Sequence, residues 1–157
     1  MSNPNPPTFD DTCWVRDTCL CLHLQRAARA IARRFDTAFR ALDLTNGQFS
    51  LLMSLNRPEP ATMPDVANLL AMDRTTLTAA LKPLERRGLV TVVVNPTDRR
   101  GRRLGLTPHG QNLLAAALTI WQREHAAIEA TTFTGGDASR LRAELQALSS
   151  AAGSTEN

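Results

Sequence analysis

Hydrophobic residues recur every three or four positions along most of this chain, a pattern typical of amphipathic helices. One long helix is predicted over residues 12–42, where the apolar stripe consists of Leu20, Leu24, Ala27, Ile31, Phe35, Ala38 and Leu42. A stripe of this length is more than a small domain covers by itself. We therefore expect this helix to pack against a second chain.

Three shorter helices are predicted from their capping residues. Thr45 and Gln48 have the spacing of a capping box at the start of the first. Thr62 begins the second, and Asp73 begins the third, which stops at Gly88. Because only a tight connection separates the second helix from the third, the pair is expected to form a helix-turn-helix.

A two-stranded hairpin, or wing, is predicted next. Residues 89–94 are apolar and β-branched, residues 95–98 favour a turn, and residues 102–106 alternate as a returning strand. One more amphipathic helix starts at Pro108, and a last one follows Gly135 and Gly136. The predicted fold class is mainly α with a small two-stranded β wing, a winged helix-turn-helix.

Positive charge is concentrated between Lys82 and Arg103. Seven basic residues lie there against two acidic ones, a net +5 in a chain whose formal total is +3. Such a concentration favours a polyphosphate partner, because each neutralised phosphate releases condensed counterions. A charged face that contacts only solvent produces the same pattern.

The third short helix has a candidate recognition face. If Leu77, Leu81 and Leu84 face the core, the opposite side is free to meet a DNA major groove. The candidate DNA-binding residues of this helix are Arg74, Thr75, Thr76, Thr78, Lys82 and Arg86. Small side chains let the backbone approach base edges, while Arg and Lys reach guanine or phosphate oxygens. Taken alone, this face also fits an ordinary solvated helix.

The wing carries a second candidate site. Asp98, Arg99, Arg100 and Arg102 lie at or beside its turn, where like charges repel one another unless an anion lies near. Asp98 can brace one arginine, and the remaining guanidinium groups suit the negative potential of a narrow minor groove. Charges that only prevent strand pairing are the alternative.

These motifs resemble the MarR (multiple antibiotic resistance regulator) family of winged-helix transcriptional regulators. The resemblance lies in three runs of sequence, Leu44-Thr45-x-x-Gln48-Phe49, Leu84-Glu85-Arg86-Arg87-Gly88-Leu89-Val90 and Asp98-x-Arg100-x-x-x-Leu104-x-Leu106-Thr107. It implies an obligate homodimer that binds double-stranded DNA at a palindromic operator and usually represses until a ligand or oxidant arrives. By position, the resemblance makes Arg100 the minor-groove residue and Asp98 its salt-bridge support.

The same resemblance implies domain boundaries. Residues 12–42 and 107–152 are expected to be dimerisation helices, interleaved between two chains. Residues 43–106 are expected to form the DNA-binding lobe of a single intertwined domain. We expect residues 1–11 and 153–157 to be disordered.

Candidates for a sensor lie in the first helix. Cys21 lies where the peroxide-sensing branch of the family has a reactive cysteine, but that branch activates it with tyrosines and this chain has none. A helical cysteine is otherwise most often a small buried residue. The family's usual effector is a small aromatic or anionic molecule. Cys19 and His23 could share a metal ion, but Cys21 points away from them, and we expect no metal and no cofactor.

Other classes of protein are disfavoured. No apolar run is long enough to span a bilayer, and the first residues lack the features of a secretion signal. Three cysteines, an odd number near one end, fit a reducing compartment, so we expect a cytoplasmic protein with no membrane partner. A nucleophile with a base, or a C-x-x-C pair, would point to an enzyme, and the sequence shows neither. A winged-helix module that binds protein or RNA is the alternative from a different class.

Overall fold

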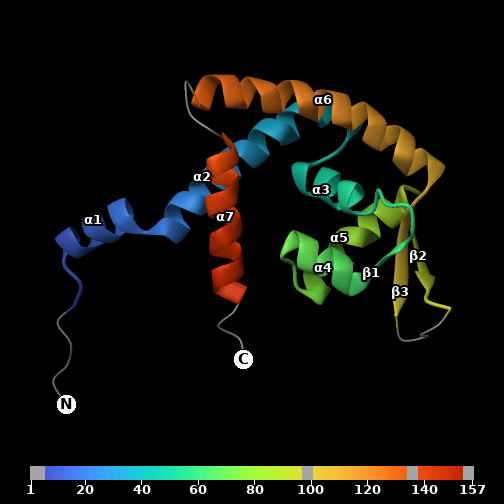
Figure 1. The fold of residues 1–157 in the computed structure, drawn as a ribbon, viewed down its shortest axis with the longest axis horizontal. Helices are drawn as coiled ribbons and strands as arrows, with labels where there is room; N and C mark the ends of the chain where they lie inside the picture. Colours follow the sequence, from blue (N-terminus) through green and yellow to red (C-terminus); the bar gives the residue numbers. More distant parts are fainter. Residues whose placement is uncertain (1–5, 97–100, 134–137, 154–157) are drawn as a thin grey trace, which may run out of the picture. The chain divides into compact units, whose positions relative to one another are not determined.

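The computed structural model describes residues 6–96, 101–133 and 138–153. It is mostly helical with one small sheet, as Figure 1 shows, and it confirms the predicted winged helix-turn-helix class. Its elements are α1 (Phe9–Thr18), α2 (Leu20–Ala38), the 3-10 helix η1 (Arg40–Leu42), α3 (Asn46–Ser54), β1 (Ala61–Thr62), α4 (Met63–Leu70), α5 (Arg74–Arg86), β2 (Val90–Val94), β3 (Arg102–Leu106), α6 (Pro108–Thr132) and α7 (Ala138–Gly153). The described residues up to Leu114 form one compact unit, and those from Ala115 onward form a second. Within the described ranges, no helix combines the length and hydrophobicity that a bilayer crossing requires.

The start of the chain differs from the prediction of one helix over residues 12–42. Helix α1 begins at Phe9 because Thr8 and Asp11 form a capping box. The Thr8 hydroxyl accepts from the Asp11 N–H at 3.2 Å, and the Asp11 carboxylate accepts from the Thr8 N–H at 2.8 Å. Residues 9–11 lie in α1 and Gly153 is the last residue of α7, where the sequence led us to expect disorder. Residues 1–5 and 154–157, for which disorder was also expected, lie outside the described residues.

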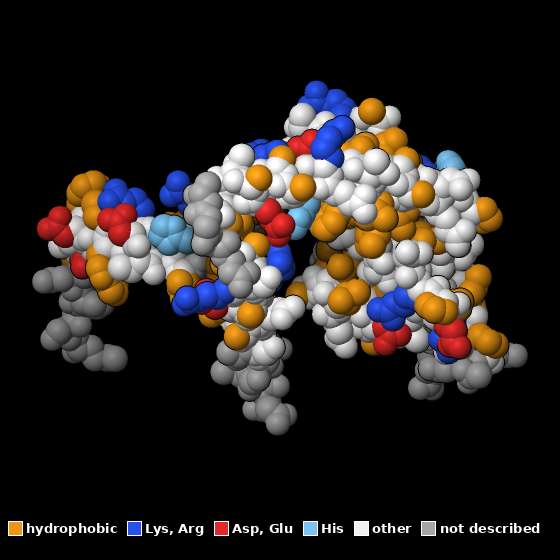
Figure 2. Space-filling view, turned by 45° about the horizontal axis from the view of Figure 1, so that its top comes forward, with side chains coloured by type: hydrophobic (Ala, Val, Ile, Leu, Met, Phe, Trp, Pro, Cys, Tyr) orange, Lys and Arg blue, Asp and Glu red, His pale blue; other side chains and the backbone are white. Residues whose placement is uncertain are grey.

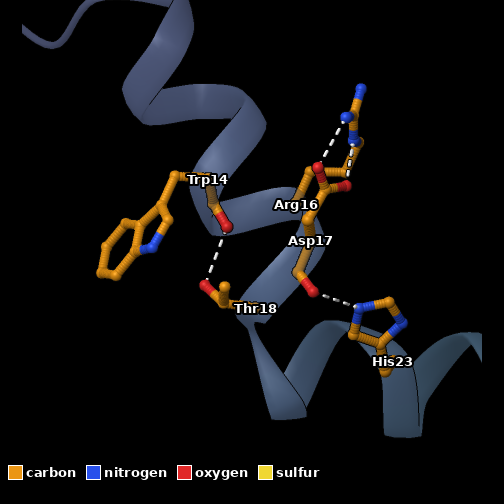
Figure 3. A network of polar contacts seen from close by, with 5 residues as sticks. All are labelled: Trp14, Arg16, Asp17, Thr18 and His23. Atoms are coloured by element: carbon orange, nitrogen blue, oxygen red, sulfur yellow. Dashed lines mark hydrogen bonds and ion pairs between the residues drawn. The ribbon is translucent and has the colours of Figure 1, made fainter.

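Cys19 divides the first helical segment into α1 and α2. Its backbone is extended, with ψ at 107°, and its Sγ accepts from the Leu22 N–H at 3.5 Å, so this thiol caps α2. Figure 3 shows the polar contacts at the break. Arg16 and Asp17 form an ion pair at 2.6 Å, and His23 Nε2 lies 3.3 Å from the Asp17 carbonyl oxygen. Because capping rules favour Ser, Thr, Asp and Asn, a cysteine cap gave no signal in the sequence.

The three short helices begin at their predicted caps. In α3, the Thr45 hydroxyl accepts from the Gln48 N–H at 3.2 Å, and Gln48 Oε1 accepts from the Thr45 N–H at 3.0 Å. Thr62 and Asp65 form the same reciprocal pair at the start of α4. Asp73 caps α5. These bonds confirm the predicted starts of both helices of the helix-turn-helix.

The sheet has three strands, one more than predicted. Its order is β1-β3-β2, with antiparallel pairing throughout, and the wing hairpin pairs Val94 with Arg102 at its outer end. The additional strand β1 pairs with β3 through Ala61, which lies opposite Leu104. A strand of two residues is too short to show the alternation from which strands are predicted.

The core of the first unit lies between the helix-turn-helix, the sheet and the aromatic side chains of α2 and α3. Leu77, Leu81 and Leu84 are buried as predicted, with exposed fractions of 0, 4 and 0%. The ring centroids of Phe39 and Phe49 lie 5.0 Å apart, and both side chains are buried. This core fixes α4, α5 and the sheet around one another.

The end of the wing is joined tightly to the start of α6. The Thr107 hydroxyl donates to the Gly88 carbonyl at 2.6 Å and accepts from the Gly110 N–H at 3.0 Å. The Thr107 N–H donates to the Leu89 carbonyl at 3.1 Å. A Cβ atom added to Gly110 would lie 2.0 Å from the Leu89 oxygen, so only glycine fits this contact.

In the second unit, the end of α6 and the start of α7 are linked by an ion pair. Arg142 Nη1 on α7 lies 2.7 Å from Glu129 Oε1 on α6. His125 stacks on Trp121 with ring centroids 4.5 Å apart. The predicted break at Gly135 and Gly136 lies outside the described residues.

Candidate nucleic-acid interface

The predicted recognition residues share the exposed face of α5. All six side chains are exposed, while the leucines of the opposite face are buried, so the structure brings together Arg74, Thr75, Thr76, Thr78, Lys82 and Arg86. Pro83 lies inside α5, yet the helix continues to Arg86. The face is thus continuous along the helix.

The three threonines of this face differ in what their hydroxyls contact. The Thr76 hydroxyl donates to the Asp73 carboxylate at 2.6 Å, and the Thr78 hydroxyl donates to the Arg74 carbonyl at 2.7 Å. Thr75 makes no side-chain hydrogen bond with any residue that the structure describes. Thr75 is therefore the threonine whose hydroxyl is available to an outside partner.

Asp73 holds the N-terminal end of α5. Hydrogen bonds from the Thr76 hydroxyl, and then from the Thr76 N–H at 2.8 Å, keep the pKa of Asp73 below its ordinary value. The carboxylate is therefore charged at neutral pH and lies at the positive end of the helix dipole. The first turn of the recognition face is fixed by the protein itself before any partner binds.

Two grooves separate the helix-turn-helix from the wing. One has a volume of about 390 Å³ and lies beside Pro64 and Asn95. The other, of about 290 Å³, lies beside Lys82. Both grooves are lined by Arg74 of α5 and Arg102 of β3. Tertiary structure therefore brings a cation from the recognition helix and one from the wing to the same place.

The tip of the wing lies largely outside the described residues. This applies to three of the predicted wing residues, Asp98, Arg99 and Arg100. Arg102 is described and exposed, at the start of β3. The Asn95 N–H donates to the Gly101 carbonyl at 3.1 Å, which joins the two strands next to the tip.

Two arginines of the basic cluster bind the protein rather than face outward. Arg87 donates to the carbonyls of Leu42 and Asp43. Arg103 Nη1 donates to the Pro60 carbonyl at 3.1 Å, next to β1. The local charge available to a partner is therefore smaller than the sequence indicated. On the face seen in Figure 2, Lys and Arg side chains lie beside Asp and Glu rather than in one basic surface.

The cysteine segment contains free thiols of unequal exposure. Cys21 is exposed, and its Sγ accepts from Gln25 Nε2 at 3.2 Å, whereas Cys13 and Cys19 are half-buried. Cys21 is therefore not buried within its own chain. His23 contacts the Asp17 carbonyl, and no metal-binding group of three or more His, Cys, Asp or Glu occurs among the described residues.

Large apolar side chains are exposed along α1 and α2. Phe9 and Trp14 on α1 have exposed fractions of 78 and 68%, and Leu20 and Ile31 on α2 have 64 and 45%. Figure 2 shows hydrophobic side chains at the surface of the α1 segment, at the left of the view. Exposed apolar surface of this extent is typical of an interaction site. The first part of the predicted stripe, from Leu20 to Ile31, is thus left exposed, whereas Phe35 further along it is buried.

Comparison with known proteins gives consistent matches. Residues 42–101 match the sequence model of the MarR family. The organic hydroperoxide resistance transcriptional regulator of Bacillus subtilis (strain 168) is 30% identical over 101 residues, which are 64% of this chain and 69% of that protein. The M. tuberculosis transcriptional regulator MosR, in a crystal structure with DNA, is 34% identical with a TM-score of 0.80, over 88% of this chain and 99% of that chain. The transcriptional repressor CouR, bound to a 23-mer DNA duplex, is 28% identical with a TM-score of 0.69, over 88% of this chain and 95% of that chain.

Proposed function

Since this chain belongs to the MarR family, it is a DNA-binding transcriptional regulator, and we propose that it binds a palindromic operator as a homodimer through α5 and the wing. The observation that carries this proposal is the exposed face of α5, where Arg74 lines the same grooves as Arg102 of the wing. The similarity to MosR, which was crystallised with DNA, supports it.

The recognition helix and the wing have different parts in this proposal. Helix α5 enters the major groove, where Thr75 meets base edges and Lys82 neutralises a phosphate. Arg100 enters the adjacent minor groove, with Asp98 as its support. A two-fold axis places the second α5 about one DNA turn, or roughly 34 Å, away. An operator with two-fold symmetry follows from this arrangement.

Dimerisation is supported by the apolar surface of the N-terminal helices. Helix α1 has no buried residue, although a helix of its length is marginal in water without cover. The exposed apolar residues of α2 also require cover from another surface. A second copy of the chain supplies that cover, with residues 12–42 and 107–152 as the dimerisation helices.

We propose that the protein is a repressor released by a small aromatic or anionic ligand. Such a ligand acts only by binding one spacing of the two recognition helices more tightly than the other. The alternative is a thiol-based sensor that uses Cys21, and the exposure of this thiol favours it. The name of the Bacillus subtilis relative, a regulator of organic hydroperoxide resistance, supports the same alternative.

A selection experiment tests DNA binding. The purified protein is used to select duplexes from a random-sequence library, and the selected duplex then serves as the probe for all variants. Arg100→Ala is expected to weaken binding about tenfold through the loss of its groove contact. Arg26→Ala, on the exposed surface of α2, removes the same charge and is the control. Unchanged affinity of the Arg100 variant would refute the wing role.

The same probe separates the alternatives. If no duplex is selected even in dilute buffer, the chain is a module that binds protein or RNA. For the sensor, operator binding of the wild type and of Cys21→Ser is compared before and after treatment with peroxide. Equal loss of binding in both proteins excludes Cys21.

A further inference from the structure

Arg87 forms a long-range contact at the C-terminal end of the recognition helix. It is the C-cap residue of α5, and its Nη1 donates to the Asp43 carbonyl at 2.5 Å. Its Nη2 donates to the Leu42 carbonyl at 3.3 Å. The exposed fraction of its side chain is 30%. One guanidinium group therefore joins the end of α5 to a segment more than forty residues earlier in the chain.

The carbonyls that Arg87 binds lie where the N-terminal helical segment ends. Leu42 is the last residue of η1, and Asp43 follows it in a left-handed conformation with φ at 49°. The last carbonyls of a helical segment have no partner within the segment, and a cation there satisfies them. The contact is thus a cap supplied to one helical segment by the end of another.

A second contact fixes the same junction from the other side. The Asp36 carboxylate, on α2, accepts from the Asn46 N–H at 2.7 Å, at the first residue of α3. Asp36, Asp43 and Arg87 line one cavity of about 360 Å³. The turn between α2 and α3 is therefore held at Asn46 by α2 and at Asp43 by α5.

We propose that Arg87 is a positioning residue for DNA recognition, which fixes the angle of α5 by tying its end to the α2–α3 junction. The inference rests on the proposed function, since it assumes that α5 reads an operator. Arg87 acts through the two carbonyls rather than through a phosphate. Its neighbour Arg86 is exposed and makes no such contact with the residues that the structure describes, so the two adjacent arginines have different roles.

The proposal separates specific from non-specific binding. Base readout requires α5 to be held in one orientation, whereas phosphate contacts tolerate a looser fit. Loss of the Arg87 contact therefore lowers affinity for the operator more than affinity for random DNA. Loss of a phosphate contact lowers both, and it reduces the slope of log affinity against log salt by about 0.9.

The experiment compares Arg86→Gln with Arg87→Gln, the same substitution at adjacent positions. Binding of the full-length variants to the selected duplex and to a random-sequence duplex is measured over a series of salt concentrations. For Arg87→Gln we expect about a tenfold loss on the selected duplex, little change on the random duplex and an unchanged salt slope. For Arg86→Gln we expect losses on both duplexes and a smaller slope.

Two further variants keep the test decisive if Arg87→Gln fails to fold. Arg87→Lys retains the charge but loses the forked donor that reaches two carbonyls, so it is expected to lose operator affinity as well. Asp43→Asn retains the carbonyl and removes only an exposed carboxylate 3.9 Å from Arg87, so it is expected to bind normally. Wild-type affinity in Arg87→Lys, or a reduced slope in Arg87→Gln, would overturn the proposal. Failure of the wild type to select any duplex would instead refute the proposed function.

Discussion

Arginines that are adjacent in this sequence have different roles. Arg86 is exposed on α5 and Arg87 binds two backbone carbonyls, while Arg102 lines both grooves beside the wing. Arg103 binds the Pro60 carbonyl and holds the start of β1. Arg87 and Arg103, which bind backbone carbonyls, stabilise the lobe that carries the exposed Arg86 and Arg102. Charge density along the sequence is therefore a poor measure of the charge that DNA would meet.

A single glycine fixes the start of α6 against the wing. We expect Gly110→Ala to destabilise the protein by about 3 kcal/mol, because its new Cβ would meet backbone atoms that cannot move aside. Unfolding by urea at one fixed protein concentration measures the change. Gly47→Ala is the control, since nothing lies within 4 Å of its added Cβ and alanine favours the helix by about 0.5 to 1 kcal/mol. Equal stability of the two variants would contradict this account of the junction.

At the scale of elements, carboxylates at helix starts organise the DNA-binding lobe and α1. Asp11, Asp65 and Asp73 each accept hydrogen bonds from the side chain and the backbone N–H of a nearby threonine. These bonds lower the pKa of each carboxyl, with the threonine side chain as the largest cause in all three. These caps fix the residue at which each helix begins, which the spacing of hydrophobic residues does not define.

The pKa shifts predict a loss of stability in acid. Because folding lowers the three pKa values from 3.8, the caps stabilise fully above that value and lose their effect as the pH falls through the folded pKa values. The melting temperature should therefore decrease as the pH is lowered below about 4. Asp73→Asn keeps a good N-cap without a titrating group, so its melting temperature should depend less on pH. Identical pH profiles for variant and wild type would show that the Asp73 cap has no part in the effect.

At the scale of the whole molecule, the exposed apolar residues of α1 and α2 call for a second chain. Ile31→Glu places a charge in this stripe at a side chain that is already 45% exposed, so the monomer should still fold. We expect the variant to sediment with the 17.2 kDa mass of one chain and to lose operator binding.

The control for dimerisation lies on another face of α2. Arg33→Glu adds an acid roughly 160° around the helix from Ile31 and is expected to remain dimeric. A wild-type protein that sediments as a monomer would remove the basis for paired recognition helices. A dimeric Ile31→Glu variant would show instead that another surface joins the two chains.

The sequence by itself determined the helix-turn-helix, its caps, the wing strands and the exposed face of α5, because these depend on residues within one or two helical turns. The capping pairs of Thr45 and Thr62, and the inward leucines of α5, needed no distant partner to be predicted. Tertiary structure alone decided the contacts made across long stretches of chain. Strand β1 forms because β3 lies beside it. Arg87 binds the carbonyls of Leu42 and Asp43, which lie within its reach, and so does not contribute to the basic face of α5. Such contacts depend on how elements pack, and no local spacing encodes them.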